Sequence, residues 1–142
     1  MYKILKIASL VLICSLLVIP TKLIAEPAKI VPVIIPQTIP EKITYYANKY
    51  NVSEAIMIQI VSCETAGSFN PTMRSECRYK FSDPKRNIVK GEQEMSYGLA
   101  QIHLPDHPNV TYEQATNPDF ALKFLAENLS AGKGSMWSCY RK

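Results

Sequence analysis

The chain has 142 residues, of which 47% are hydrophobic, and this length allows one compact domain with an export leader but not two independent cores. Its formal net charge is +4, but three of its lysines, Lys3, Lys6 and Lys22, lie near the N-terminus. From Glu26 onward 13 basic and 12 acidic residues remain, which excludes the broad positive surface of a general nucleic-acid-binding protein.

The N-terminus has the pattern of a secretory signal. Lys3 and Lys6 precede an apolar run of 13 residues, 7–19, which is shorter than a transmembrane helix requires. Ala25 is a small residue at a suitable cleavage position before Glu26. The sequence therefore predicts a signal peptide over residues 1–25 and an exported protein that is periplasmic, associated with the cell wall or extracellular.

One alternative stays open for this leader. Leu23, the third residue before the expected cut, is larger than the small residue preferred there. An uncleaved leader would act as an anchor and give the protein a transient association with the membrane. Lipid attachment at Cys14 is not expected, because the large residue Ile13 precedes it.

Residues 26–40 have the composition of a spacer. Pro27, Pro32, Pro36 and Pro40 follow one another too closely for a continuous helix. We expect an extended, semi-rigid segment that leads into a folded domain over residues 41–142.

Two helices are expected at the start of this domain. Helical spacing of apolar residues begins after Pro40 and ends at residues 48–51. Ser53 is a suitable N-cap for a second helix that reaches Glu64. The apolar stripe of this second helix contains Ile56, Met57, Ile60 and Val61.

Glu64 is the most unusual residue of that stripe. At 100° per residue it lies about 20° from Met57 around the helix axis, so a carboxylate stands in the middle of an apolar face. Carboxylates are rarely buried unless another group pairs with them or the protein uses them. Burial would raise the pKa of Glu64 and keep it a proton donor near neutral pH. The pattern equally allows the helix to end at residues 65–67 with Glu64 in solvent.

The next segment, residues 68–93, is predicted to be a long loop, because it has few apolar residues and is interrupted by proline and glycine. Loops of this length in small domains are often functional. Basic residues are frequent in it, and they indicate either an ordinary solvated loop or a surface for an anionic wall polymer. These basic residues are Arg74, Arg78, Lys80, Lys85, Arg86 and Lys90.

Short elements complete the chain. Residues 95–103 alternate large and small side chains, which favours a short hairpin or an irregular strand. Thr111 is a suitable N-cap for a short helix, and a final amphipathic helix is expected from Asp119 to about Leu129. Trp137 indicates a packed C-terminal tail. The predicted fold is therefore mainly α with a small β element.

Four segments, in this order and spacing, resemble the lytic transglycosylase domain of the lysozyme superfamily, over roughly residues 41–140. They are Cys63-Glu64-Thr65 with Phe69-Asn70-Pro71, then Ser96-Tyr97-Gly98-Leu99-Ala100-Gln101-Ile102, then Ala115-Thr116-Asn117-Pro118, and last Trp137-Ser138-Cys139-Tyr140. The resemblance implies an α+β, lysozyme-like fold whose hairpin lines a sugar-binding cleft. The Asn70-Pro71 pair lies two residues later than is usual in the family, so we expect an enlarged turn after Glu64.

The resemblance implies that Glu64 is the single catalytic acid and base. It would protonate the glycosidic oxygen between N-acetylmuramic acid and N-acetylglucosamine, then act as base while the muramoyl 6-hydroxyl attacks, giving a 1,6-anhydro end. The alternatives are a muramidase that uses water on the same residues and a wall-binding or structural protein without turnover. Glu94 is the candidate if a second acid exists, but its place beside the polar loop favours a solvated charge.

The same resemblance implies which residues bind the glycan. These are Ser96, Tyr97, Gly98, Gln101, Ile102 and Tyr140. The expected partner is therefore the glycan strand of peptidoglycan, bound by a monomer, and we expect neither a nucleic acid partner nor a cofactor.

The expected export bears on the cysteines, because disulfides form and persist in exported proteins. Three of them remain after residue 25, so one is left over when a disulfide forms. We expect Cys63 to bond Cys139, which would tie the catalytic helix to the tail, and Cys77 to stay free or to pair between chains. A metal site built from these cysteines with His103 and His107 is not expected, because the chain has no tight Cys-x-x-Cys pair.

Overall fold

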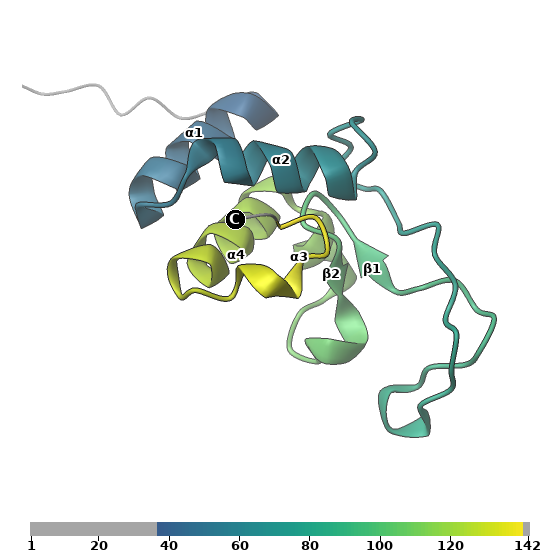
Figure 1. The fold of residues 1–142 in the computed structure, drawn as a ribbon. Coiled ribbons are helices and arrows are strands. Elements are labelled where there is room, and N and C mark those ends of the chain that lie inside the picture. The colour runs from purple at the N-terminus through teal and green to yellow at the C-terminus, as the bar shows by residue number, and fades with distance from the viewer. Residues whose placement is uncertain (1–36, 141–142) are drawn as a thin grey trace, which may run out of the picture. The chain divides into compact units, whose positions relative to one another are not determined.

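Four α-helices make up most of the regular structure of the computed structural model, which describes residues 37–140 (Figure 1). They are α1 (Ile39–Tyr50), α2 (Glu54–Glu64), α3 (Tyr112–Thr116) and α4 (Pro118–Ser130). The strands β1 (Ser96–Tyr97) and β2 (Ile102–His103) form a two-stranded antiparallel hairpin. Three short 3₁₀ helices complete the fold, η1 (Pro84–Arg86), η2 (Leu104–Asp106) and η3 (Gly134–Met136).

This architecture confirms the prediction of a small, mainly α domain with a short hairpin. The predicted signal peptide and all but the last four residues of the predicted spacer lie outside the described residues. Within residues 37–140, every helix is too short or too polar to cross a membrane.

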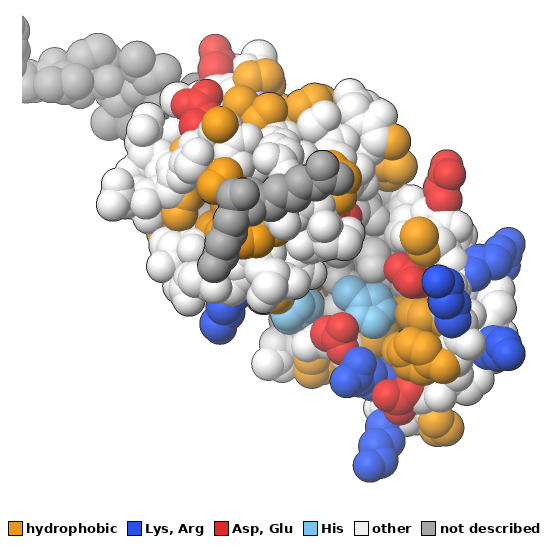
Figure 2. Space-filling model, in the orientation of Figure 1, with side chains coloured by type: hydrophobic (Ala, Val, Ile, Leu, Met, Phe, Trp, Pro, Cys, Tyr) orange, Lys and Arg blue, Asp and Glu red, His pale blue; other side chains and the backbone are white. Residues whose placement is uncertain are grey.

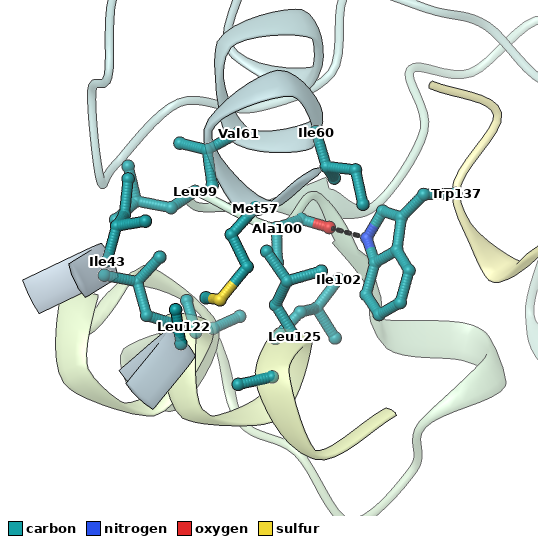
Figure 3. Close-up of a cluster of buried hydrophobic side chains, with 14 residues drawn as sticks. Ile43, Met57, Ile60, Val61, Leu99, Ala100, Ile102, Leu122, Leu125 and Trp137 are labelled. Atoms are coloured by element: carbon teal, nitrogen blue, oxygen red, sulfur yellow. Dashed lines mark hydrogen bonds between the residues drawn. The ribbon is translucent and has the colours of Figure 1, made fainter. Parts of the chain in front are cut away.

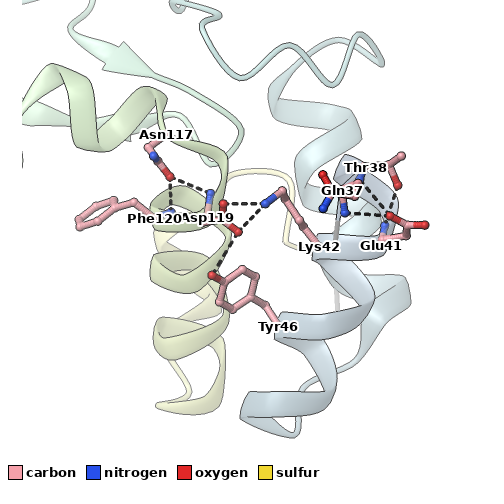
Figure 4. A network of polar contacts seen from close by, with 8 residues as sticks. All are labelled: Gln37, Thr38, Glu41, Lys42, Tyr46, Asn117, Asp119 and Phe120. Carbon is pink, nitrogen blue, oxygen red and sulfur yellow. Dashed lines mark hydrogen bonds and ion pairs between the residues drawn. The ribbon is translucent and has the colours of Figure 1, made fainter. Parts of the chain in front are cut away.

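Helix α1 begins at Ile39, slightly before the expected start. The reason is a capping box, in which the Thr38 side chain accepts from the Glu41 N–H while the Glu41 carboxylate accepts from the Thr38 N–H at 3.0 Å (Figure 4). Pro40 fits in the first turn, where its missing N–H costs no helical hydrogen bond. Asn51 ends the helix in the left-handed conformation.

The predicted starts of α2 and α3 are confirmed by their caps, and α4 begins one residue before the expected Asp119. The Ser53 hydroxyl accepts from the Ile56 N–H, so α2 starts at Glu54. Thr111 forms a second capping box, with Gln114, at the start of α3. The Asn117 side-chain oxygen then accepts from two N–H groups in the first turn of α4.

The core lies between α2 and α4 and extends to the hairpin (Figure 3). Met57, Ile60 and Val61 of α2 face Leu122 and Leu125 of α4, and all five side chains are buried. This burial is the main stabilising term that the apolar stripe of α2 provides. The C-terminal tail joins this core at Trp137, whose indole N–H donates to the carbonyl of Ala100 at 2.7 Å.

A polar contact fixes α1 against α4. The Lys42 ammonium donates to both carboxylate oxygens of Asp119, at 2.8 and 2.6 Å, and the Tyr46 hydroxyl donates to the same group at 3.4 Å (Figure 4). Burial raises the pKa of Tyr46 to about 12, and the neighbouring Asp119 charge adds to this effect. The phenol therefore stays neutral and keeps donating throughout the physiological range.

The turn after α2 is built around Thr65. Thr65 is buried, its hydroxyl donates to the Val61 carbonyl at 2.7 Å, and it accepts from the Phe69 N–H at 3.1 Å. Ala66, Gly67 and Phe69 all adopt positive φ angles, which lets the chain turn sharply away from the helix axis. Thr65 therefore closes the turn and fixes the position of the preceding glutamate.

Residues 74–95, which we call the arm, extend away from the helices (Figure 1). This segment was expected to be a loop, and it does lack regular strands, but it folds back on itself in a ladder-like manner. Isolated bridges pair Arg78 with Gln93 and Asp83 with Ile88. The arm thus has a defined course and returns the chain to β1.

Candidate active site

Glu64 is the last residue of α2, and its side chain is half-buried. Burial raises the pKa of its carboxyl above the ordinary value of 4.5, while a hydrogen bond from the Cys139 backbone N–H opposes part of this rise. The carboxyl is therefore partly desolvated but still reaches solvent. This combination is suitable for a group that gives a proton to a ligand and takes one back.

A groove runs past Glu64 on both sides. On one side Glu64 borders a pocket with Met73 and Ser75, and on the other it borders a hollow of about 320 Å³ with residues of the arm. Gln101 and Ser138 line both hollows, so the two are continuous at Glu64. A third hollow, lined by Ile102, His107, Phe124 and other residues, continues the groove beside β2 and also includes Gln101. Glu64 thus borders two adjoining hollows, one on each side, and the third hollow adjoins both of them at Gln101.

A disulfide fixes the wall of this groove next to Glu64. Cys63 and Cys139 are bonded, as predicted, with their Cα atoms 6.1 Å apart, and they close a span of 76 residues. The Gln59 side chain donates to the Cys139 carbonyl at 2.9 Å. Cys77 is free and exposed, and it lines the same pocket as the disulfide. The bond holds the Cys139 N–H against the Glu64 carboxylate.

Two of the predicted glycan-binding residues lie in the groove with Glu64. Ser96 of β1 and Gln101, in the hairpin turn, both line the arm side of the groove. Gln101 has a positive φ of 45°, and its side-chain NH₂ donates to the carbonyls of Gly98 and Met73, at 3.0 and 3.3 Å. The amide oxygen of Gln101 has no partner among the described residues and is open to a ligand.

Gly98 and Ile102 have structural roles in the hairpin. At Gly98, φ is +77°, and a Cβ would lie 1.9 Å from the Ala115 carbonyl oxygen, so only glycine lets the turn approach α3. Ile102 is buried in the core and only backs the third hollow.

The structure does not bring Tyr97 and Tyr140 to Glu64. The Tyr97 ring packs edge-on against Tyr112, with ring centroids 5.0 Å apart, and lines none of the hollows of the groove. Tyr140 lines a separate pocket with Ser53 and other residues at the start of α2, whereas Glu64 ends that helix. The disulfide at Cys139 directs the preceding residues, not Tyr140, toward the glutamate.

A chain of polar contacts that the sequence did not reveal lines the groove opposite α2. The Tyr79 hydroxyl accepts from the Met95 N–H at 3.0 Å and lies 2.9 Å from His103 Nε2. His103 Nδ1 lies 2.8 Å from Asp106 Oδ2, and the Arg86 guanidinium donates to Asp106 Oδ1 at 2.8 Å. The hydrogen bond from His103 is the main cause that lowers the pKa of Asp106, partly opposed by burial. No sequence pattern predicts this chain, because 24 residues separate Tyr79 from His103.

The basic residues of the arm divide into two groups. Arg74 and Arg78 donate to carbonyls of the arm itself, and Arg86 pairs with Asp83 and Asp106. The three guanidinium groups therefore hold the arm together. The exposed lysines are Lys80, Lys85 and Lys90. Lys and Arg side chains gather over the arm on the face shown in Figure 2.

Acidic residues also line the groove. Glu94 borders the same hollow as Glu64, and Glu76 borders the pocket on the other side. Between residues 37 and 140, no three His, Cys, Asp or Glu side chains cluster in a way that could hold a metal ion.

Comparison with protein-family models, curated proteins and solved structures finds no match to this chain. The chemistry of the groove therefore carries the functional argument.

Proposed function

We propose that the chain is an exported peptidoglycan lytic transglycosylase in which Glu64 is the only catalytic acid and base. The observation that carries this proposal is the half-buried Glu64 carboxyl, whose pKa is raised and which borders both sides of a continuous groove. A linear glycan needs such a groove, because sugar residues on both sides of the scissile bond must bind.

The chemistry assigns Glu64 two steps. As the acid it protonates the glycosidic oxygen between N-acetylmuramic acid and N-acetylglucosamine, and the raised pKa keeps a share of it protonated for this step. As the base it then takes the proton of the muramoyl 6-hydroxyl, which attacks C1 of the same sugar. The product is a 1,6-anhydromuramoyl end, formed without water.

The arrangement of elements supports a lysozyme-like version of the mainly α fold. The resemblance implies a glutamate at the end of a helix, facing a short hairpin that lines the sugar cleft. Glu64 ends α2, and Ser96 and Gln101 of the hairpin line the groove beside it. The proposed partner is accordingly the peptidoglycan glycan strand, bound outside the cytoplasm by a monomer.

Hydrolysis is the second candidate, and one observation favours it. Glu94 lines the same hollow as Glu64, and its side chain has no hydrogen bond or ion pair within the described part of the chain. A second carboxylate is what most glycosidases use to activate water or to form a covalent intermediate. The other described acids of that hollow have partners, since Glu64 accepts from the Cys139 N–H and Asp106 pairs with Arg86.

The test compares the parent protein with Glu64→Gln on purified peptidoglycan. Gln keeps the shape and accepts from the Cys139 N–H but cannot donate a proton, so release of fragments should fall at least a thousandfold. Glu54→Gln, at the exposed opposite end of the same helix, is the matched control and should cleave like the parent.

Mass spectrometry of the fragments separates the candidates. Anhydro ends, lighter by one water than hydrolysed ends, support the transglycosylase. Hydrolysed ends, lost in Glu94→Gln, favour the muramidase instead. Glycan binding by the parent without any product would leave a wall-binding protein, and cleavage by Glu64→Gln at the parent rate would remove Glu64 from the mechanism.

A further inference from the structure

Phe81 is an aromatic side chain that the fold leaves uncovered inside the groove. It lies on the arm, it is 57% exposed, and it borders the same hollow as Glu64. The arm has a second exposed apolar residue, Val89, at 48% exposure, but Val89 lines none of the hollows of the groove. The exposed ring therefore lies in a hollow that the arm shares with Glu64.

The arm is held firmly at this point. Tyr79, two residues before Phe81, is buried, and its hydroxyl bonds both the Met95 N–H and His103. When the Tyr79 hydroxyl donates to His103 Nε2, the Nδ1–H of His103 donates to Asp106, so both ring nitrogens have a hydrogen-bond partner. Because His103 belongs to β2, the contact fixes the arm to the hairpin that lines the groove.

The charges of this hollow argue against an anionic ligand beside Phe81. Among residues 37–140, Arg86 is the one Lys or Arg side chain that borders it, and Arg86 is already paired with Asp83 and Asp106. Glu94 adds an unpaired carboxylate. A neutral molecule with an apolar face therefore suits this surface better than a phosphate or a carboxylate does.

We propose that the Phe81 ring is a stacking platform for a neutral N-acetylhexosamine ring of the glycan, and that Tyr79 and His103 are positioning residues that hold it opposite Glu64. The pyranose face carries C–H groups that pack on an aromatic ring, while the hydroxyl and N-acetyl groups at the sugar's edge stay free for polar partners. This inference rests on the proposed function, because it takes its ligand from the reaction assigned to Glu64.

The experiment measures glycan binding in the Glu64→Gln background, where no cleavage interferes. The two probes are peptidoglycan strands freed of their stem peptides and N-acetylglucosamine oligomers of equal length. Phe81→Ala should weaken binding of both by about tenfold, because stacking is a property of the sugar ring that both probes share. Phe81→Trp should bind at least as tightly as the parent.

Val89→Ala is the matched control, since it removes an exposed apolar side chain of the same arm outside the groove. It should leave the affinity of both probes unchanged. Because Phe81 is exposed, Phe81→Ala should keep the thermal midpoint of the parent, so lost binding cannot come from unfolding. Unchanged affinity in Phe81→Ala, or an equal loss in Val89→Ala, would overturn the proposal.

A double-mutant cycle tests the positioning role. Tyr79→Phe removes only the hydroxyl that joins the arm to His103, and it should weaken binding about threefold when Phe81 is present. In the Phe81→Ala background the same change should have no further effect, because Tyr79 acts through Phe81. Additive losses would show that Tyr79 does not work through the ring.

The outcomes separate this inference from the proposed function. If the parent protein releases no fragments but its glycan binding depends on Phe81, the stacking platform is supported and the proposed catalysis is refuted. Cleavage that depends on Glu64, together with Phe81-independent binding, would refute the platform alone.

Discussion

Two opposing effects act on the pKa of the Glu64 carboxyl. Burial raises its pKa, and the hydrogen bond from the Cys139 N–H lowers it by a smaller amount. Because the folded-state pKa lies above the ordinary value of 4.5, the folded protein binds this proton more tightly than the unfolded chain does. The stabilising effect is fully present below pH 4.5 and is lost as the pH rises through the folded-state pKa.

This linkage gives a prediction for Glu64→Gln that is independent of activity. The variant should be more stable than the parent at pH 7, where the parent must keep a partly desolvated charge, and the difference should disappear near pH 4. Urea unfolding of both proteins at the two pH values measures it. A Gln variant that is less stable at pH 7 would show that the ionised carboxylate makes a net stabilising contact.

Gly98 allows a second prediction at a single residue. Gly98→Ala should lower the free energy of unfolding by roughly 3 kcal/mol or more, because the new Cβ would meet the Ala115 carbonyl oxygen in addition to the unfavourable positive φ. Gly132→Ala is the matched control: it has a similar φ of +74° but open space around it, so it should cost only about 1 kcal/mol. Equal losses in both variants would mean that the hairpin turn can move away from α3.

The elements around the groove depend on the Cys63–Cys139 bond. It joins the last turn of α2 to a tail that also contacts the fold through the Trp137–Ala100 and Gln59–Cys139 hydrogen bonds. The Cys63→Ser/Cys139→Ser protein should lose roughly 2–5 kcal/mol of stability, because the unfolded chain is no longer constrained across the 76-residue span. Thermal or urea unfolding under non-reducing conditions measures the loss.

Cys77→Ser provides the control for this element, since Cys77 is exposed and unbonded. Its unfolding transition should match that of the parent, and peptide mapping without reductant should find Cys77 as a free thiol. A peptide that links Cys77 to Cys63 or Cys139 would contradict the pairing.

Export of the molecule as a whole remains a prediction from its N-terminal sequence. A leader with Lys3 and Lys6 before the apolar run 7–19 should direct the chain across a membrane, and cleavage after Ala25 should leave a protein that starts at Glu26. N-terminal sequencing of the protein recovered outside the cytoplasm checks this expectation. A membrane-bound form that retains Met1 would instead support the uncleaved anchor.

Local and periodic features of the sequence by themselves determined where the helices start and which face of α2 is buried. The cap residues Thr38, Ser53, Thr111 and Asn117 act through N–H groups two or three positions away, so their patterns set the helix starts. The apolar stripe of α2 likewise determined which face enters the core, and it placed Glu64 on that face, where the side chain is half-buried.

Tertiary structure alone decided which side chains meet in the groove. No local sequence pattern links the segments that contain Tyr79, Arg86 and His103. These residues meet only because the arm folds back onto the hairpin. Tertiary structure also decided that Tyr140 lies away from the groove. The path of the tail after the disulfide places this residue at the start of α2. Contacts between distant segments depend on the path of the whole chain, whereas caps and stripes depend on neighbours within a turn or two.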